Sequence, residues 1–490
     1  MKKIFLLVFI TFFGILGTAR ANSGFELTVR VNGYPAGEQL RLGQHHTGRQ
    51  LLLADTAVFD RRRGTWTFRR DEPLEGGMYM LVSFSDGEAD GTAELIIDKN
   101  QRFSVEINHP FNAENIANMR FRNSPENQVF QDLNVKTRAW LEESRNVQRE
   151  LEAIEDKTSP EAEALQERGR AAWEKTTNAR NQFMADNPDH LVTVFWRSQT
   201  PIDVPEAPDY IPEDERQSWR YNYWKDNFFA NFDLTDSRLF RMPFFVFQQR
   251  LNEYLETVLS PHSDSIISGV VHLIEQTREN MEIFRFTLSE ILTNYLRSQI
   301  VGYDAIWVYL IDRYYATGKA SWTSEATMEN LLRAANRARP LLAGNVPAEF
   351  LSPDLNEGQP NGQWRSVFGA RTRYTVVFFW ESTCGHCKRE MPLLRDFYNA
   401  KRKELDFEVF AVCRDRNLEV CWNYLTTNNM TDWINVTGTA STVQWDELWD
   451  VNSVPTIFVL DSQNRIVTKR ISVEQIEPFI RNWNALHYSD

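Results

Sequence analysis

Residues 375–387 read TVVFFWESTCGHC, an apolar run that leads into two cysteines separated by two residues. The apolar part predicts a buried strand, and the segment KREMPLL that follows predicts a helix beginning at the cysteine pair. A strand, a short turn and a helix with CxxC at its start form the layout of a dithiol–disulfide switch. We therefore expect Cys384 and Cys387 to form a redox-active disulfide.

Cys384 is expected to be the attacking sulfur because it stands at the start of the helix. Unpaired backbone N–H groups and the helix dipole favour an anion there, and the thiolate is the reactive form of cysteine. His386, inside the turn, is expected to favour the thiolate further, as a cation or as a hydrogen-bond donor. Cys387, three residues along the helix, is placed to attack the mixed disulfide and release the product.

The C-terminal region, residues 345–490, alternates predicted strands with predicted helices and indicates an α/β domain. Strands are expected at 374–380, 407–412, 433–436, 456–460 and 465–469, and helices at 387–401, 417–427, 442–449 and 473–486.

The order of these elements resembles the thioredoxin fold, and in particular the TlpA/ResA branch of exported bacterial thioredoxin-like proteins. The residues that carry the resemblance are CGHC after FW, and Val454-Pro455-Thr456 before a final hairpin and helix. The resemblance implies that Pro455 is a cis-proline facing the CxxC, and that Val454 and Trp380 contact the substrate. The whole chain also resembles, more loosely, multidomain envelope proteins in which a β domain and a helical domain precede such a module.

Two positions depart from the thioredoxin pattern. Thr383 stands where thioredoxins commonly have tryptophan, and Phe378 stands where they have a buried aspartate. The usual proton acceptor for Cys387 is therefore missing. Glu381 is the nearest carboxylate, and it is expected either to substitute as a base through water or to be plain surface.

All four cysteines fall between positions 384 and 421, so sulfur is concentrated where chemistry is expected. Cys413 and Cys421 could form a structural disulfide, relay electrons from the CxxC or remain buried thiols. Exported proteins enter an oxidising environment, where free thiols tend to be oxidised, and this favours the disulfide. Seven residues separate these two cysteines, whereas a second CxxC would be needed for a strong zinc signal, so no metal and no cofactor are expected.

The N-terminus has the composition of a signal peptide, residues 1–21. Lys2 and Lys3 precede an apolar run over 4–16, and Ala19-Arg20-Ala21 supplies small residues at the expected cleavage site. No other run is long enough to span a bilayer. We expect a soluble protein of the periplasm or cell envelope.

Two further domains are expected between the signal peptide and the redox module. Residues 24–110 show short alternating runs typical of an antiparallel β-sandwich, and residues 120–340 show the helical period of an all-α domain. The formal charge of −13 opposes binding to nucleic acid through a general basic surface.

The sequence as a whole predicts a thiol–disulfide oxidoreductase that acts on protein disulfides or dithiols. The CGHC is shared with the isomerase family, and reductase or isomerase is the favoured direction, with an electron donor in the membrane or envelope. A peroxiredoxin would require threonine at the position of Glu381. The alternative from another class is a binding or assembly protein whose β and helical domains bind a partner, with the redox module as an accessory.

Overall fold

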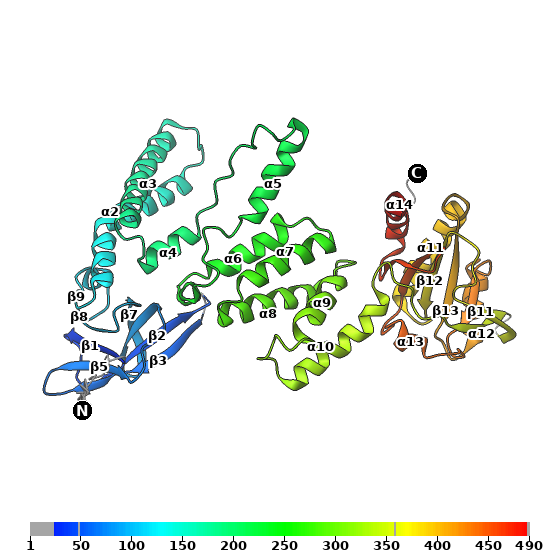
Figure 1. Cartoon of the computed structure of the whole chain (residues 1–490), viewed down its shortest axis with the longest axis horizontal. Coiled ribbons are helices and arrows are strands. Elements are labelled where there is room, and N and C mark those ends of the chain that lie inside the picture. The colour runs from blue at the N-terminus through cyan, green and yellow to red at the C-terminus, as the bar shows by residue number, and fades with distance from the viewer. Residues whose placement is uncertain (1–23, 48–49, 357–358, 488–490) are drawn as a thin grey trace, which may run out of the picture. The chain divides into compact units, whose positions relative to one another are not determined.

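The computed structural model describes residues 24–47, 50–356 and 359–487 (Figure 1). It divides into two compact units, residues 1–254 and 255–490. The expected signal peptide lies outside the described residues. Within those that are described, no helix is long and apolar enough to cross a membrane.

The first unit begins with two β-sheets, whose inner faces enclose a common apolar core. Their strands are β1 (Phe25–Asn32), β2 (Leu40–His46), β3 (Gln50–Thr56), β4 (Val58–Asp60), β5 (Thr65–Arg70), β6 (Gly77–Ser85), β7 (Glu88–Ile97), β8 (Arg102–Asn108) and β9 (Arg120–Arg122). The sheet orders are β4-β5-β1-β8-β9 and β3-β2-β6-β7. Alternation along β1 buries Phe25, Leu27 and Val29, as the sequence predicts.

One strand pair corrects the expectation of a wholly antiparallel sandwich. β1 and β8 pair in parallel, with Leu27 opposite Phe103 and Val29 opposite Val105. The chain leaves the first sheet after β5, builds β6 and β7 in the second sheet, and returns to the first with β8. Such a crossover allows a parallel pair, which a tight hairpin cannot form.

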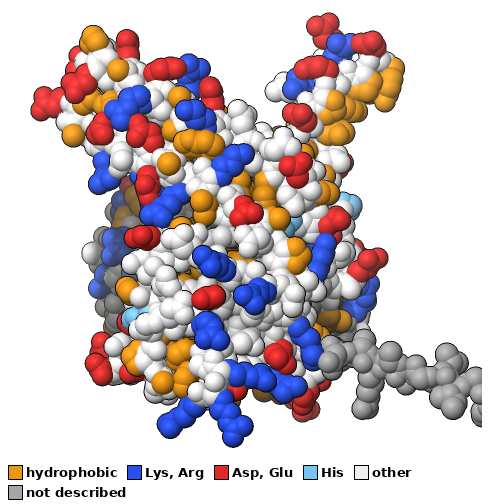
Figure 2. All heavy atoms as spheres, turned by 90° about the vertical axis from the view of Figure 1, so that its left-hand side faces the viewer, with side chains coloured by type: hydrophobic (Ala, Val, Ile, Leu, Met, Phe, Trp, Pro, Cys, Tyr) orange, Lys and Arg blue, Asp and Glu red, His pale blue; other side chains and the backbone are white. Residues whose placement is uncertain are grey.

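Helices follow the sheets in the first unit. They are α1 (Ala113–Ala117), α2 (Pro125–Ala153), α3 (Pro160–Asp186), α4 (Leu191–Ser198), α5 (Arg216–Asp226) and α6 (Val246–Glu253). α2 and α3 form the expected hairpin, each with proline in its first turn. Figure 2 shows a face of the molecule on which Lys and Arg side chains are interspersed with Asp and Glu.

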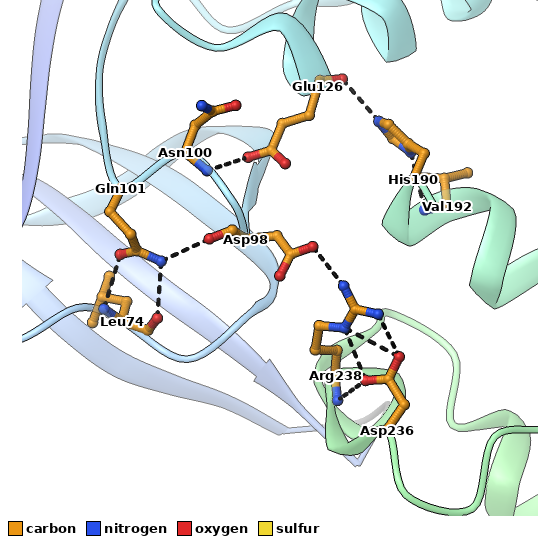
Figure 3. Close-up of polar contacts among 9 residues, drawn as sticks. All are labelled: Leu74, Asp98, Asn100, Gln101, Glu126, His190, Val192, Asp236 and Arg238. Atoms are coloured by element: carbon orange, nitrogen blue, oxygen red, sulfur yellow. Dashed lines mark hydrogen bonds and ion pairs between the residues drawn. The ribbon is translucent and has the colours of Figure 1, made fainter. Parts of the chain in front are cut away.

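A polar network joins the sheets of the first unit to its helices (Figure 3). The Arg238 guanidinium bridges two carboxylates, at 2.6 Å from Asp98 and 2.5 Å from Asp236. Glu126, in the first turn of α2, accepts the Asn100 N–H through its carboxylate, while its carbonyl oxygen accepts a hydrogen bond from His190 Nε2 at 3.0 Å. The segment after β7 is thus joined to α2 and to the short helical turn Ser237–Arg241, and α2 is joined in turn to the start of α4.

The second unit starts with α7 (Ser263–Gln276), α8 (Met281–Arg297), α9 (Asp304–Leu310) and α10 (Glu325–Ala338). Its α/β part consists of β10 (Leu351–Asn356), β11 (Gln359–Ser366), β12 (Tyr374–Trp380), α11 (Gly385–Leu405), β13 (Phe407–Cys413), α12 (Leu418–Thr427), β14 (Ile434–Thr437), α13 (Trp445–Leu448), β15 (Thr456–Asp461), β16 (Ile466–Lys469) and α14 (Ile476–His487). Among the described residues of the second unit, the strands form one seven-stranded sheet in the order β11-β10-β14-β13-β12-β15-β16.

β12 lies between β13 and β15 in the sheet, and it is buried along its whole length because helices cover both faces. Alternate side chains point to opposite faces. Val376 and Phe378 pack with Met391 of α11 in one core cluster. Val377 and Phe379 pack with Trp445 of α13 in the other. This burial fixes the end of β12, from which the cysteine turn departs.

Candidate redox site

The CGHC segment forms the turn between β12 and α11. Cys384 is the residue that caps the helix, and its sulfur accepts the backbone N–H of Cys387 at 3.3 Å. Both cysteines are free thiols in this structure. The chain therefore places Cys384 where a helix presents unpaired N–H groups.

The two thiols differ in exposure and in acidity. Cys387 is completely buried, whereas Cys384 is partly exposed. Burial alone would raise the pKa of Cys384, but hydrogen bonds from Cys387 and from the backbone N–H of His386 outweigh it, so this pKa lies below its usual value. Burial, with the hydrogen bond to Cys384, raises the pKa of Cys387 to about 12. Cys384 is thus suited to act as the nucleophile, and Cys387 to remain protonated until it attacks the mixed disulfide.

The loop before β15 lies against the attacking sulfur. The Val454–Pro455 peptide bond is cis, and Cys384 Sγ lies 3.4 Å from the carbonyl oxygen of Val454, to which the thiol donates. Cys384, Val454 and Pro455 are therefore brought together from segments far apart in the sequence.

His386 acts on Cys384 through its backbone. Its N–H is one of the hydrogen-bond donors that lower the pKa of Cys384. The exposed imidazole instead accepts a hydrogen bond from Arg389 through Nδ1. The expected contribution of the side chain stays a prediction, and the main chain supplies a hydrogen bond to Cys384.

Glu381 lies at the end of β12, half-buried, and its charge opposes ionisation of both cysteines. At Cys387 this charge adds to the rise in pKa that burial and the contacts with Cys384 cause, while the backbone of Glu381 lowers that pKa. At Cys384 the charge partly offsets the lowering. Its carbonyl oxygen accepts the backbone N–H of Cys384 at 3.2 Å. Phe378, at the position of the usual aspartate, is fully buried.

The structure corrects the expectation that Trp380 contacts the substrate. The side chain is 1% exposed, and its ring packs 5.7 Å from that of Tyr424 inside the domain core. Because β12 is covered on both faces, its last residue points into the core. Ser382, two residues after Trp380, is buried as well, so the exposed part of the turn begins at Thr383.

Cys413, at the end of β13, and Cys421, in the first part of α12, are joined in a disulfide with their Cα atoms 6.7 Å apart. Both are buried. Together with Asp415 they bring three potential metal-ligand atoms within 4.8 Å of one another. A disulfide offers no thiolate to a metal, so in this state the cluster lacks the donors that a thiolate site requires.

Asp415 is the residue that the sequence analysis missed. Its Oδ2 atom accepts the backbone N–H of Ser382 at 2.7 Å and lies 3.4 Å from the sulfur of Cys413 and 3.1 Å from that of Cys421. A signal existed: β13 is the parallel neighbour of β12, and the carboxyl ends of parallel strands meet at one edge of a sheet. A carboxylate just after β13 therefore arrives beside the cysteine turn.

Comparison with known proteins places the C-terminal part of the chain. Residues 372–466 match the model of a family described as thioredoxin-like. No curated protein matches the chain. A solved domain of a possible thiol-disulfide isomerase from Cytophaga hutchinsonii is 27% identical, covers 30% of this chain and 96% of its own, and has a TM-score of 0.27.

Two other solved structures are similar. A thioredoxin-like protein from Bacteroides caccae is 15% identical, covers 58% of this chain and 99% of its own, and has a TM-score of 0.44. StoA from Bacillus subtilis is 23% identical, covers 27% of this chain and 97% of its own, and has a TM-score of 0.23.

The family match confirms the predicted fold of the last region: it is a thioredoxin-like domain. A cysteine pair stands at the start of α11 in this domain. The expected multidomain organisation, with β-sheets and helices before this domain, is also confirmed.

Proposed function

We propose that this protein exchanges disulfides with protein substrates through Cys384 and Cys387. The observation that carries the proposal is the opposed acidity of the two sulfurs, a lowered pKa at Cys384 beside a raised pKa at Cys387. A metal site or a structural disulfide has no need for that difference. A nucleophile with a resolving partner requires it.

The reaction starts with attack of the Cys384 thiolate on one sulfur of a substrate disulfide. A new bond forms between Cys384 and that sulfur, the substrate bond breaks, and the second substrate sulfur leaves as a thiolate that takes a proton. Cys387 then loses its proton and attacks Cys384 Sγ, which releases the first substrate sulfur. The substrate has gained two electrons and two protons, and the enzyme holds a Cys384–Cys387 disulfide.

Several neighbouring groups serve this cycle. The N–H groups of His386 and Cys387 stabilise the thiolate, and the Val454 carbonyl, beside Pro455, holds the thiol form of Cys384 at 3.4 Å. Glu381 is close enough to influence both thiols, which supports a role as proton acceptor for Cys387 through water. We assign Val454 and Pro455 to substrate contact because they lie next to the attacking sulfur.

The direction that we propose is reduction or isomerisation. Hydrogen bonds to the Cys384 thiolate stabilise the reduced form and make the disulfide less stable, which suits a couple less reducing than one with proline at position 386. A dithiol donor in the membrane or envelope would return the electrons. We also propose that the chain is exported, because residues 1–21 have the composition of a signal peptide. The N-terminal sequence of the mature protein should then begin at Asn22, and a chain that stays in the cytoplasmic fraction with Met1 intact would contradict export.

Reduction of insulin by a dithiol donor tests the activity. The full chain should accelerate it, Cys384→Ala should abolish the acceleration, and Cys387→Ala should accumulate mixed disulfides with substrate. The two variants form a matched pair, since both remove one sulfur from the same turn. Equal trapping by both, or wild-type activity in Cys384→Ala, would contradict the proposal and favour the alternative of a binding protein.

A further inference from the structure

The cysteine turn is attached to the rest of the domain by a bond that does not involve the active cysteines. Ser382 is 5% exposed, and its backbone N–H donates to Asp415 Oδ2 at 2.7 Å. Its hydroxyl has no hydrogen-bond partner within the described part of the chain. The main-chain bond to Asp415 is therefore the polar contact that holds this residue, two positions before Cys384.

Asp415 is itself held by a closed loop. The Cys413–Cys421 disulfide joins the start and the end of the segment that carries it. At the base of the segment, the N–H of Arg414 donates to the carbonyl oxygen of Trp380 at 2.9 Å. Asp415 is only 9% exposed, and the oxygen that Ser382 uses is the one that touches both sulfurs.

We propose that Asp415 is a positioning residue for the CGHC turn, and that the Cys413–Cys421 disulfide keeps it in place and thereby controls the reactivity of Cys384. The inference rests on the proposed function and assigns a second, controlling cysteine pair to the same site. Asp415 does not touch the reacting sulfur; it acts through Ser382.

The state of the disulfide changes what surrounds the carboxylate. Disulfide sulfurs carry no hydrogen, so Ser382 is the donor to Oδ2 while the bond is closed. Opening it with a dithiol reductant adds two electrons and two protons, and gives two S–H groups at the same oxygen. These compete with Ser382 for the carboxylate, and the segment that carries Asp415 is no longer closed. The turn then loses its anchor, and the donors around Cys384 lose their alignment.

Asp415→Asn changes both the charge near Cys384 and the support of the cysteine turn. These two effects shift the pKa of Cys384 in opposite directions, so the measured shift shows which one dominates. Removal of a nearby negative charge by itself favours the Cys384 thiolate and lowers its pKa. The neutral amide accepts a weaker hydrogen bond from Ser382 than the carboxylate does, so the anchor loosens, the N–H groups that stabilise the thiolate lose their alignment, and the pKa rises. We expect the weaker support of the turn to outweigh the loss of charge, so that alkylation of Cys384 becomes about tenfold slower at neutral pH.

Asp461→Asn is the matched control. Asp461 is 2% exposed and also holds a turn, since it accepts the N–H groups of Gln463 and Arg465, both at 2.9 Å. It pairs with Tyr374, at the end of β12 remote from the cysteine turn. This variant should lose stability and keep the alkylation profile of the wild-type protein.

The experiment measures the alkylation of Cys384 by iodoacetamide against pH in the full chain, with the modified peptide identified by mass spectrometry. Wild-type protein is compared before and after reduction of Cys413–Cys421, together with Asp415→Asn and with the double variant Cys413→Ala/Cys421→Ala. All three changes should slow alkylation and move its midpoint to higher pH. The double variant decides the matter if Asp415→Asn does not fold.

Two failures are distinguishable. If the wild-type Cys384 already titrates as an ordinary thiol, the proposed function fails. If the wild-type thiol is activated but opening or deleting the second pair leaves its profile unchanged, or Asp415→Asn speeds alkylation, the proposed function stands and this inference is overturned.

Discussion

The sulfur of Cys384 lies 3.4 Å from the carbonyl oxygen of Val454, a residue 70 positions further along the chain. A carbonyl oxygen suits the thiol form, which donates to it. The N–H of Cys387, at 3.3 Å from the same sulfur, suits the thiolate. The attacking sulfur therefore has a partner for each protonation state, and the balance between them sets its reactivity.

Replacing His386 by proline tests whether the main chain or the ring stabilises the thiolate. Proline is tolerated in the first turn of a helix but has no N–H. The variant loses one hydrogen bond to a charged sulfur, worth about 1.5–3 kcal/mol, so the reduced form becomes less stable. The midpoint potential of the Cys384–Cys387 couple, measured against glutathione, should fall by about 30–60 mV.

His386→Ala is the control for that variant because it keeps the N–H and removes only the imidazole. It should change the potential far less than His386→Pro. A larger shift in the alanine variant would show that the ring, and not the backbone, acts on the thiolate.

The parts of this protein that could be predicted from sequence are those with local causes. The apolar run before CGHC predicts β12, and the proline-led starts of α2 and α3 predict their hairpin. The parallel pairing of β1 with β8 could not be read from either strand, because it depends on a crossover through the other sheet.

The site divides in the same way. Cys384 and Cys387 lie three positions apart within one recognisable motif. Asp415 reaches Ser382 only through the register of β13 against β12, which aligns Cys413 with Trp380. The burial of Trp380 likewise follows from the helices that cover the sheet, so it could not be predicted from the neighbouring residues in the sequence.

A buried ion pair in the second unit predicts a pH-dependent loss of stability. Lys469 is 9% exposed, and its Nζ atom lies 2.6 Å from Asp304 and 2.5 Å from the carbonyl oxygen of Leu341. Asp304→Asn leaves a buried ammonium group without its counter-charge, so the free energy of unfolding in urea should fall by about 3 kcal/mol at neutral pH.

The sign of the pH effect follows from the lysine. Burial holds the pKa of Lys469 below its ordinary value, and the nearby Asp304 partly offsets this. Without Asp304 the folded state releases the proton more easily than the unfolded chain, so stability rises with pH in that interval. The deficit of the variant should therefore shrink as the pH approaches about 10. Lys469→Met, which removes the charge, should show no such recovery.

The polar network of Figure 3 is expected to stabilise the first unit, so breaking it should lower the free energy of unfolding of that unit alone. Arg238→Met leaves the carboxylates of Asp98 and Asp236, each 11% exposed, without the cation between them. We expect the free energy of unfolding to fall by about 3 kcal/mol. Arg170→Met, which breaks ion pairs on the exposed face of α3, should cost less than about 1 kcal/mol. Equal losses in denaturant unfolding would show that the network adds nothing beyond surface charge.

The central claim is that Cys384 ionises at a lower pH than an ordinary cysteine, while Cys387 stays protonated there. The direct measurement is the rate of alkylation of each cysteine against pH in the reduced full chain. The account predicts that Cys384 reacts with a midpoint below that of a free cysteine, and that Cys387 remains unreactive until the pH approaches about 12. Two thiols that titrate together at the ordinary value would contradict it.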